Sequence, residues 1–130
     1  MEGEQHNKII YKDLSYEITG VLFDVYNQLG PGLPEKVYQN ALEIAFQKKK
    51  WQFEAQLYSP LEYDNYKVGS CYLDFLIEKK IVLEIKVNKR FTKQDFNQIK
   101  KYLKTTGIKL GILATFADQG VKFTRVLNLY

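Results

Sequence analysis

Two carboxylates and a lysine stand in a part of the sequence that is otherwise apolar. Asp74 lies in the run 72–77, and Glu84 and Lys86 lie in the run 81–87. A short polar link joins the two runs, so we expect them to pair as an antiparallel hairpin. Because successive side chains of a strand point to opposite faces, Glu84 and Lys86 share one face, and Asp74 can point the same way. The sequence therefore predicts that the three charged groups meet.

Such a cluster suits the hydrolysis of a phosphodiester bond. That reaction needs a nucleophile made from water and neutralisation of the charge that develops on the phosphate oxygens. Mg²⁺ does both when a few carboxylates hold it and water fills its remaining positions. A lysine beside that water can orient it, help to deprotonate it, or stabilise the transition state.

The alternative is an edge hairpin whose polar face meets solvent, with Glu84 and Lys86 simply exposed. Two observations count against it. Asp is depleted in strands, so propensity explains Asp74 poorly. Apolar residues also occupy one whole face of the hairpin and much of the other, and a hairpin buried on both faces does not hold three charges without compensation.

The positions that would support this hairpin follow from hydrophobic periodicity and from breaks at Gly and Pro. The first predicted elements are a helix from Leu14 to the break at 30–32, a helix over 34–50, and a bent or broken strand over 51–64 interrupted by Pro60. The charged hairpin follows. After it come a helix from Thr92 to about Gly107 and strands at 110–114 and 122–127. This order predicts a single α/β domain with a mixed sheet and helices packed against it.

The composition fits one folded domain. The chain has 130 residues, of which 45% are hydrophobic, which excludes a disordered protein. Residues 1–12 are expected to form a flexible tail. Cys71 is the single cysteine, so no internal disulfide and no zinc cluster can form. The sequence shows neither a signal peptide nor a membrane span, and we expect a reduced, cytoplasmic protein.

Charge is distributed unevenly along the chain. Residues 1–65 hold 6 Lys/Arg against 10 Asp/Glu, whereas residues 66–130 hold 13 against 5. The basic second half suits a polyanionic partner such as nucleic acid, although a solvated helix face would give the same pattern.

Three further polar residues lie where they could reach the cluster. Glu35 lies one turn before Tyr38, near the core-facing stripe of its helix, although a carboxylate at a helix N-terminus is also favoured by the dipole. Gln98 and Tyr102 are four residues apart, so they face one direction and could bind a phosphate, a base or Lys86. Taken in isolation, the two residues are better explained as an ordinary surface amide and a half-buried tyrosine.

Together these segments resemble a known family. The segment 32–38 reads as GxxExxY, Asp74 with Glu84-Ile85-Lys86 reads as D-x(n)-ExK, and the segment 98–102 reads as QxxxY. In this order they are similar to the GxxExxY family of the PD-(D/E)XK nuclease superfamily, over about residues 14–128. Leu73 stands where the proline that names the superfamily is expected.

The resemblance implies a restriction-endonuclease-like αβββαβ core with one extra N-terminal helix. It implies a Mg²⁺-dependent or Mn²⁺-dependent nuclease that hydrolyses DNA phosphodiester bonds. The implied roles are metal binding by Glu35, Asp74, Glu84 and the backbone carbonyl of Ile85, assistance to the attacking water by Lys86, and positioning of substrate or lysine by Gln98 and Tyr102. A homodimer is a further expectation. The alternatives are a catalytically silent nucleic-acid-binding protein and an assembly subunit that keeps the nuclease fold.

Overall fold

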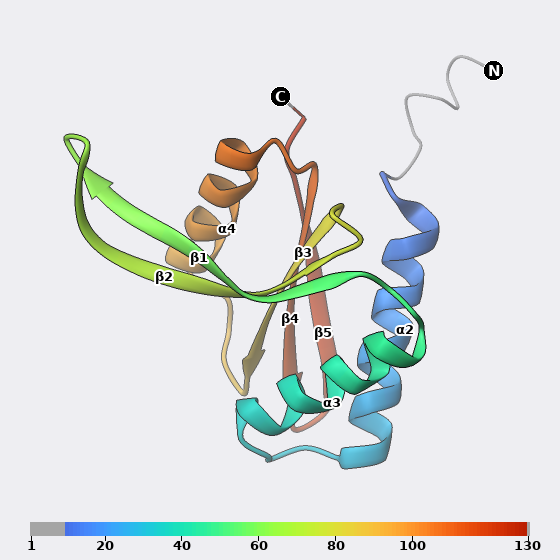
Figure 1. Cartoon of the computed structure of the whole chain (residues 1–130). Helices are drawn as coiled ribbons and strands as arrows, with labels where there is room; N and C mark the ends of the chain where they lie inside the picture. The colour runs from blue at the N-terminus through green and yellow to red at the C-terminus, as the bar shows by residue number, and fades with distance from the viewer. Residues whose placement is uncertain (1–9, 130) are drawn as a thin grey trace.

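The computed structural model of the chain describes residues 10–129 (Figure 1). The elements are α2 (Lys12–Leu29), α3 (Glu35–Lys48), β1 (Phe53–Tyr63), β2 (Tyr66–Ile77), β3 (Ile81–Val87), α4 (Lys93–Thr106), β4 (Leu110–Ala117) and β5 (Gly120–Leu127). The first helix thus begins two residues before the predicted Leu14. Of the predicted tail, residues 1–9 lie outside the described residues. None of the described helices has the length and apolar character needed to cross a membrane.

The five strands form one mixed sheet in the order β1-β2-β3-β4-β5. Every neighbouring pair is antiparallel except β3 and β4, which run parallel and are connected through α4. Helices α2 and α3 cover one face of the sheet, and α4 covers part of the other (Figure 1). The predicted α/β architecture, with two helices, three strands, a helix and two strands, is therefore confirmed.

Strand β3 is buried on both of its faces. Ile81, Leu83 and Ile85 pack in the core beneath α2 and α3, whereas Val82 packs in the second core beneath α4. By alternation, Glu84 continues the face of Val82, toward α4. An isolated carboxylate in such a strand would carry a large desolvation penalty, so its surroundings must compensate for it.

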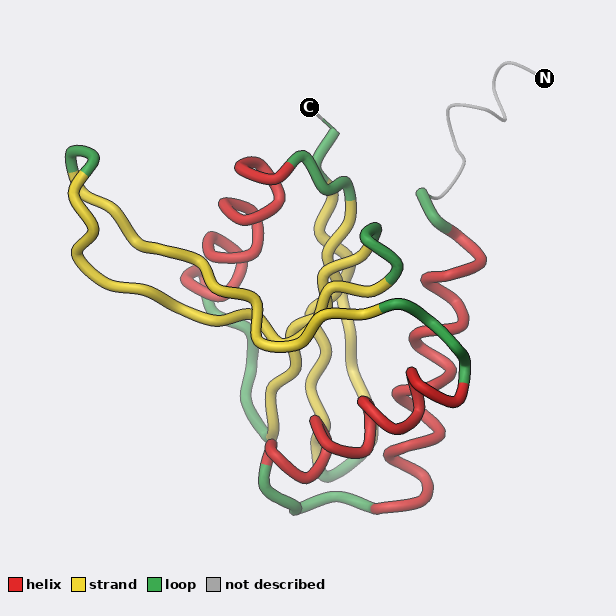
Figure 2. The backbone as a smooth tube through the Cα atoms, in the orientation of Figure 1, coloured by secondary structure: helices red, strands yellow, loops and turns green. Residues whose placement is uncertain are grey.

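The hairpin of β1 and β2 forms a long arm that turns away from the other three strands (Figures 1 and 2). Residues 51–64 were predicted to be bent or broken. The structure keeps one strand, which bends at Gln56 with a φ of 58° and at a register shift between Leu61 and Glu62. Pro60 is compatible with β1 because β1 is an edge strand, in which N–H groups on the outer side have no ladder partner.

Helix α4 lies directly on β4 at Gly111, and this contact gives a testable prediction. A Cβ added at Gly111 would lie 2.5 Å from Ile99 Cδ1 and 2.9 Å from Ile99 Cγ1. Ile99 is fully buried, so it has little room to move. We expect Gly111→Ala to lower the free energy of unfolding by about 1–3 kcal/mol, measured by urea denaturation.

Gly20 provides the matched control for this substitution. It is exposed in the interior of α2, and an added Cβ would meet nothing within 4 Å. Gly20→Ala should therefore raise the free energy of unfolding, by roughly 0.5–1 kcal/mol, because Ala is the better helix former. Similar destabilisation in both variants would show that the close approach of α4 to β4 is not the cause.

Candidate active site

The predicted carboxylates meet where β2 and β3 part. The paired register of the two strands runs from Ile77 opposite Ile81 to Phe75 opposite Leu83. At the next pair of residues, Asp74 and Glu84, side-chain carboxylates accept hydrogen bonds from backbone N–H groups in place of the backbone carbonyls. The N–H of Ile85 donates to Asp74 Oδ2 at 2.7 Å, and the N–H of Asp74 donates to Glu84 Oε1 at 3.0 Å.

Both carboxyl groups are shielded from solvent. Asp74 is 6% exposed, and the Glu84 side chain is 12% exposed. Burial raises the pKa of Asp74 despite hydrogen bonds from Ile85 and Gln39. Burial, followed by the charge of Asp74, raises the pKa of Glu84 to about 9. Two neighbouring carboxyl groups in the protein interior repel each other when both are charged, and Lys86 offsets this only in part, so the pair favours keeping a proton or binding a further positive ion.

Lys86 lies beside the carboxyl pair, as predicted, and a residue that was not predicted holds it there. Its Nζ is 4.0 Å from Glu84 Oε2 and 3.4 Å from Asp95 Oδ1. Asp95 belongs to the capping box of α4: its Oδ2 accepts from the N–H of Thr92 at 2.8 Å, and its own N–H donates to Thr92 Oγ1 at 3.1 Å.

The charge of Asp95 is secured by these contacts. Burial acts to raise its pKa, but the N–H of Thr92 and the charge of Lys86 outweigh it, so the pKa is lowered overall. The sequence shows the capping box, but it does not show that Asp95 is also the anion that positions Lys86.

Glu35 reaches the site through Gln39, a second residue that the sequence analysis missed. The Gln39 side chain donates to Asp74 Oδ1 at 2.6 Å and to Glu35 Oε2 at 3.1 Å, so it bridges the two acids. Burial and the charge of Asp74 raise the pKa of Glu35, while Lys86 lowers it, which places all three groups in one electrostatic neighbourhood. The available signal was spacing, because Gln39 follows Glu35 by one helical turn.

Tyr38 has a structural role in this arrangement. Its hydroxyl donates to the carbonyl of Gly30 at 2.6 Å and accepts from the N–H of Leu33 at 3.3 Å. Its ring stacks on Phe116 of β4 with centroids 4.3 Å apart. Tyr38 therefore ties the break before α3 to the sheet, and it fixes the helix start that carries Glu35.

The structure does not bring Gln98 and Tyr102 into contact with the carboxylates. Gln98 is half-buried on α4 and makes no side-chain hydrogen bond to another described residue. Tyr102 packs against the core beneath α4, and burial followed by the charge of Glu54 raises its pKa. Glu54 belongs to β1, so the ring of Tyr102 lies toward the arm of the sheet. Their roles stay predictions.

The donor set suits a hard divalent cation. Carboxylate oxygens are the ligands that Mg²⁺ and Mn²⁺ prefer, and the buried pair at Asp74 and Glu84 requires positive charge or a proton. Within residues 10–129, however, no group of three or more acidic, His or Cys side chains is already arranged to bind a metal ion. Instead, the amide of Gln39 bridges Glu35 and Asp74.

Fold and site together define an α/β domain with a buried carboxylate pair and a lysine at the split of two central strands. A family model described as the PD-(D/E)XK nuclease superfamily matches residues 12–126. The chain belongs to this superfamily.

Two solved structures are similar to this chain. A protein described as SSO0001 has 22% sequence identity and a TM-score of 0.53, with 72% of this chain and 49% of that chain covered. An alkaline exonuclease from Laribacter hongkongensis, LHK-Exo, has 13% identity and a TM-score of 0.49, with 72% and 55% covered. This chain therefore spans about half the length of either protein. No curated protein matches it.

Proposed function

We propose that this protein is a metal-dependent nuclease of the GxxExxY group that hydrolyses phosphodiester bonds in DNA. The observation that carries the proposal is the buried pair of Asp74 and Glu84, with Lys86 beside it, at the point where β2 leaves β3. Superfamily membership supports the reaction class. The basic second half of the chain supports a nucleic-acid substrate.

Each side chain has a separate task in this proposal. Asp74, Glu84, Glu35 and the carbonyl of Ile85 would hold Mg²⁺ or Mn²⁺, which supplies Lewis acidity and an activated water. Lys86 would orient that water and stabilise charge on the phosphate.

Asp95 and Gln39 would act on the other side chains rather than on the substrate. Asp95, 3.4 Å from Lys86, would keep the ammonium directed at the site. Gln39 would orient Asp74 through its 2.6 Å hydrogen bond, as outer partners of metal ligands commonly do. Gln98 and Tyr102 would contact the substrate strand from α4.

One observation favours a second function, that of a nucleic-acid-binding or assembly subunit without turnover. Gln39 occupies the space between Glu35 and Asp74, and both oxygens of Asp74 already accept hydrogen bonds. A protein that had given up catalysis could keep this closed arrangement. Metal binding is therefore the property that separates the two functions.

Calorimetric titration with Mn²⁺ tests this directly. We expect measurable binding heat for the wild type and none for Asp74→Asn, which keeps the size of the side chain but loses its charge. Glu62→Ala, which removes an exposed carboxylate on the arm, should bind like the wild type. Equal, negligible heats in all three proteins would contradict the metal site and favour the silent subunit. Melting curves would show that Asp74→Asn is folded.

A further inference from the structure

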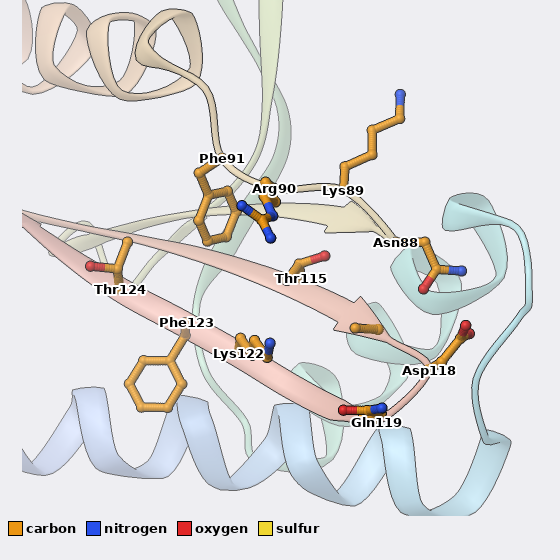
Figure 3. Close-up of a pocket in the computed structure, with 11 residues that line it drawn as sticks. Asn88, Lys89, Arg90, Phe91, Thr115, Asp118, Gln119, Lys122, Phe123 and Thr124 are labelled. Atoms are coloured by element: carbon orange, nitrogen blue, oxygen red, sulfur yellow. The ribbon is translucent and has the colours of Figure 1, made fainter.

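A second feature of the sheet lies next to the candidate active site. It is a pocket of about 570 Å³ formed by the loop after β3, the end of β4 and the hairpin into β5 (Figure 3). The polar and charged residues that line it and that matter below are Lys89, Arg90, Thr115, Asp118 and Lys122. None of them has a role in the metal site proposed above.

The register of the sheet connects this pocket to Lys86. Lys86 of β3 is paired with Thr115 of β4, and Thr115 is paired with Lys122 of β5. Residues directly opposite on neighbouring strands lie about 5 Å apart and share a face. Lys86, Thr115 and Lys122 therefore form one row across the sheet, and the pocket begins one strand away from the candidate catalytic lysine.

Thr115 is a buried polar residue in the wall of the pocket. It is only 5% exposed, yet its hydroxyl oxygen has no hydrogen-bond partner among the described residues. A buried hydroxyl without a partner costs free energy, and such groups are rare in native proteins. Thr115 lines the pocket, but its hydroxyl oxygen has almost no accessible surface. A rotation of the side chain about χ1 would turn the hydroxyl toward the pocket, where an oxygen atom of a ligand could accept the hydrogen bond that the protein itself does not provide.

The charges around the pocket favour an anion. Lys89, Arg90 and Lys122 bring three cationic groups, against the single carboxylate of Asp118. Figure 3 shows Arg90 turned inward, toward the strand that bears Thr115, whereas Lys89 extends outward from the loop. A guanidinium, an ammonium and a hydroxyl donor together match the oxygens of a phosphate group.

We propose that this pocket binds a backbone phosphate of the DNA strand, adjoining the phosphate that is cleaved. The identity of the ligand rests on the proposed function; the existence of an anion site does not. Lys122 and Arg90 neutralise the phosphate, and Thr115, once its side chain rotates toward the pocket, donates to one of its oxygens. Because the row runs from Lys86 to Lys122, the anchored phosphate fixes the position of its neighbour at the carboxylates. Such an anchor acts equally on bound substrate and transition state, so its loss raises KM more than it lowers kcat.

A DNA-binding assay tests the pocket without metal. The binding of a labelled duplex oligonucleotide is measured in EDTA by fluorescence anisotropy at several salt concentrations. Lys122→Ala should weaken binding about tenfold and lower the slope of log affinity against log salt by close to one. Thr115→Val should weaken binding several-fold with the slope unchanged, and it should raise the melting temperature, because it removes an unpaired buried hydroxyl. Lys48→Ala, which removes a cation at the far end of α3, is the control.

The outcomes separate this proposal from the proposed function. Unchanged DNA affinity in both Lys122→Ala and Thr115→Val would overturn the pocket, even if Mn²⁺ binding and cleavage were normal. Equal affinity for poly-glutamate, with the same loss in both variants, would overturn a phosphate ligand in favour of an acidic protein. If the wild type bound no Mn²⁺ but both variants lost DNA affinity, the pocket would stand and the nuclease function would fail.

Discussion

Replacing Lys86 with Ala is expected to reduce Mg²⁺-dependent cleavage of DNA by about 10²–10³-fold while Mn²⁺ binding persists. The reason is its place in the structure. The ammonium lies 4.0 Å from Glu84 and 3.4 Å from Asp95, beside the carboxylates without being one of the oxygen donors. The substitution removes the group that stabilises charge on the phosphate, and it leaves the oxygen ligands of the metal ion in place. A plasmid-nicking assay and a Mn²⁺ titration of the same preparation measure the two effects.

Two variants complete this comparison. Lys48→Ala should cleave at the wild-type rate, because Lys48 lies at the far end of α3. Asp95→Asn should keep the capping box, since its oxygen can still accept from Thr92, but it loses the charge that positions Lys86. We expect a smaller loss of about tenfold, in kcat rather than in KM. Normal cleavage by Lys86→Ala would remove this lysine from the mechanism.

The carboxylate pair and the lysine were predictable because strand alternation is a strict rule. Side chains two residues apart share a face, so Glu84 and Lys86 had to lie together, and the short link set the register that brings Asp74 opposite Glu84. Burial on both faces also followed from the sequence, since nearly every other residue of the two runs is apolar. Helix boundaries followed from the Gly and Pro breaks and from Thr92.

What the sequence could not show is where the strand ladder ends. Alternation would be the same if β2 and β3 stayed paired beyond Phe75, and the carboxylates would then have no N–H groups to accept from. The parting of the strands coincides with the bend of the arm, where Gln56 has a φ of 58° and Leu73 packs in the core beneath α4. These are tertiary effects, and no local pattern contains them.

Gln39 and Asp95 were missed for a different reason. Each already has an ordinary explanation in its own helix, as a polar position on α3 and as a capping residue of α4. Only the packing of both helices beside β3 gives them a second contact, with Asp74 and Lys86 respectively. Thr115 lay just beyond the predicted strand at 110–114, whereas β4 extends to Ala117, and its missing partner is visible only after the fold places it.

The stability of the metal-free protein is expected to fall as pH rises from about 5 to 9. In the unfolded chain Glu84 releases its proton near its ordinary pKa, whereas the folded protein holds that proton until the pKa of about 9. Between these values the folded state binds more protons than the unfolded state, so alkali favours unfolding. The loss approaches about 1.4 kcal/mol per pH unit while one proton differs between the states. Urea denaturation in EDTA at several pH values measures it.

Glu84→Gln separates this explanation from general alkaline sensitivity. Glutamine has nearly the shape of the protonated carboxyl group and keeps an oxygen that can accept from the N–H of Asp74, but it cannot ionise. The variant should therefore lose most of the slope and exceed the wild type in stability at pH 9, while losing affinity for Mn²⁺. Mn²⁺ should in turn stabilise the wild type most at high pH, since it replaces the proton between the carboxylates. A variant as pH-sensitive as the wild type would place the titrating group elsewhere. The buried carboxyl group that is expected to weaken the metal-free fold at high pH is thus the same group that is proposed to hold the ion.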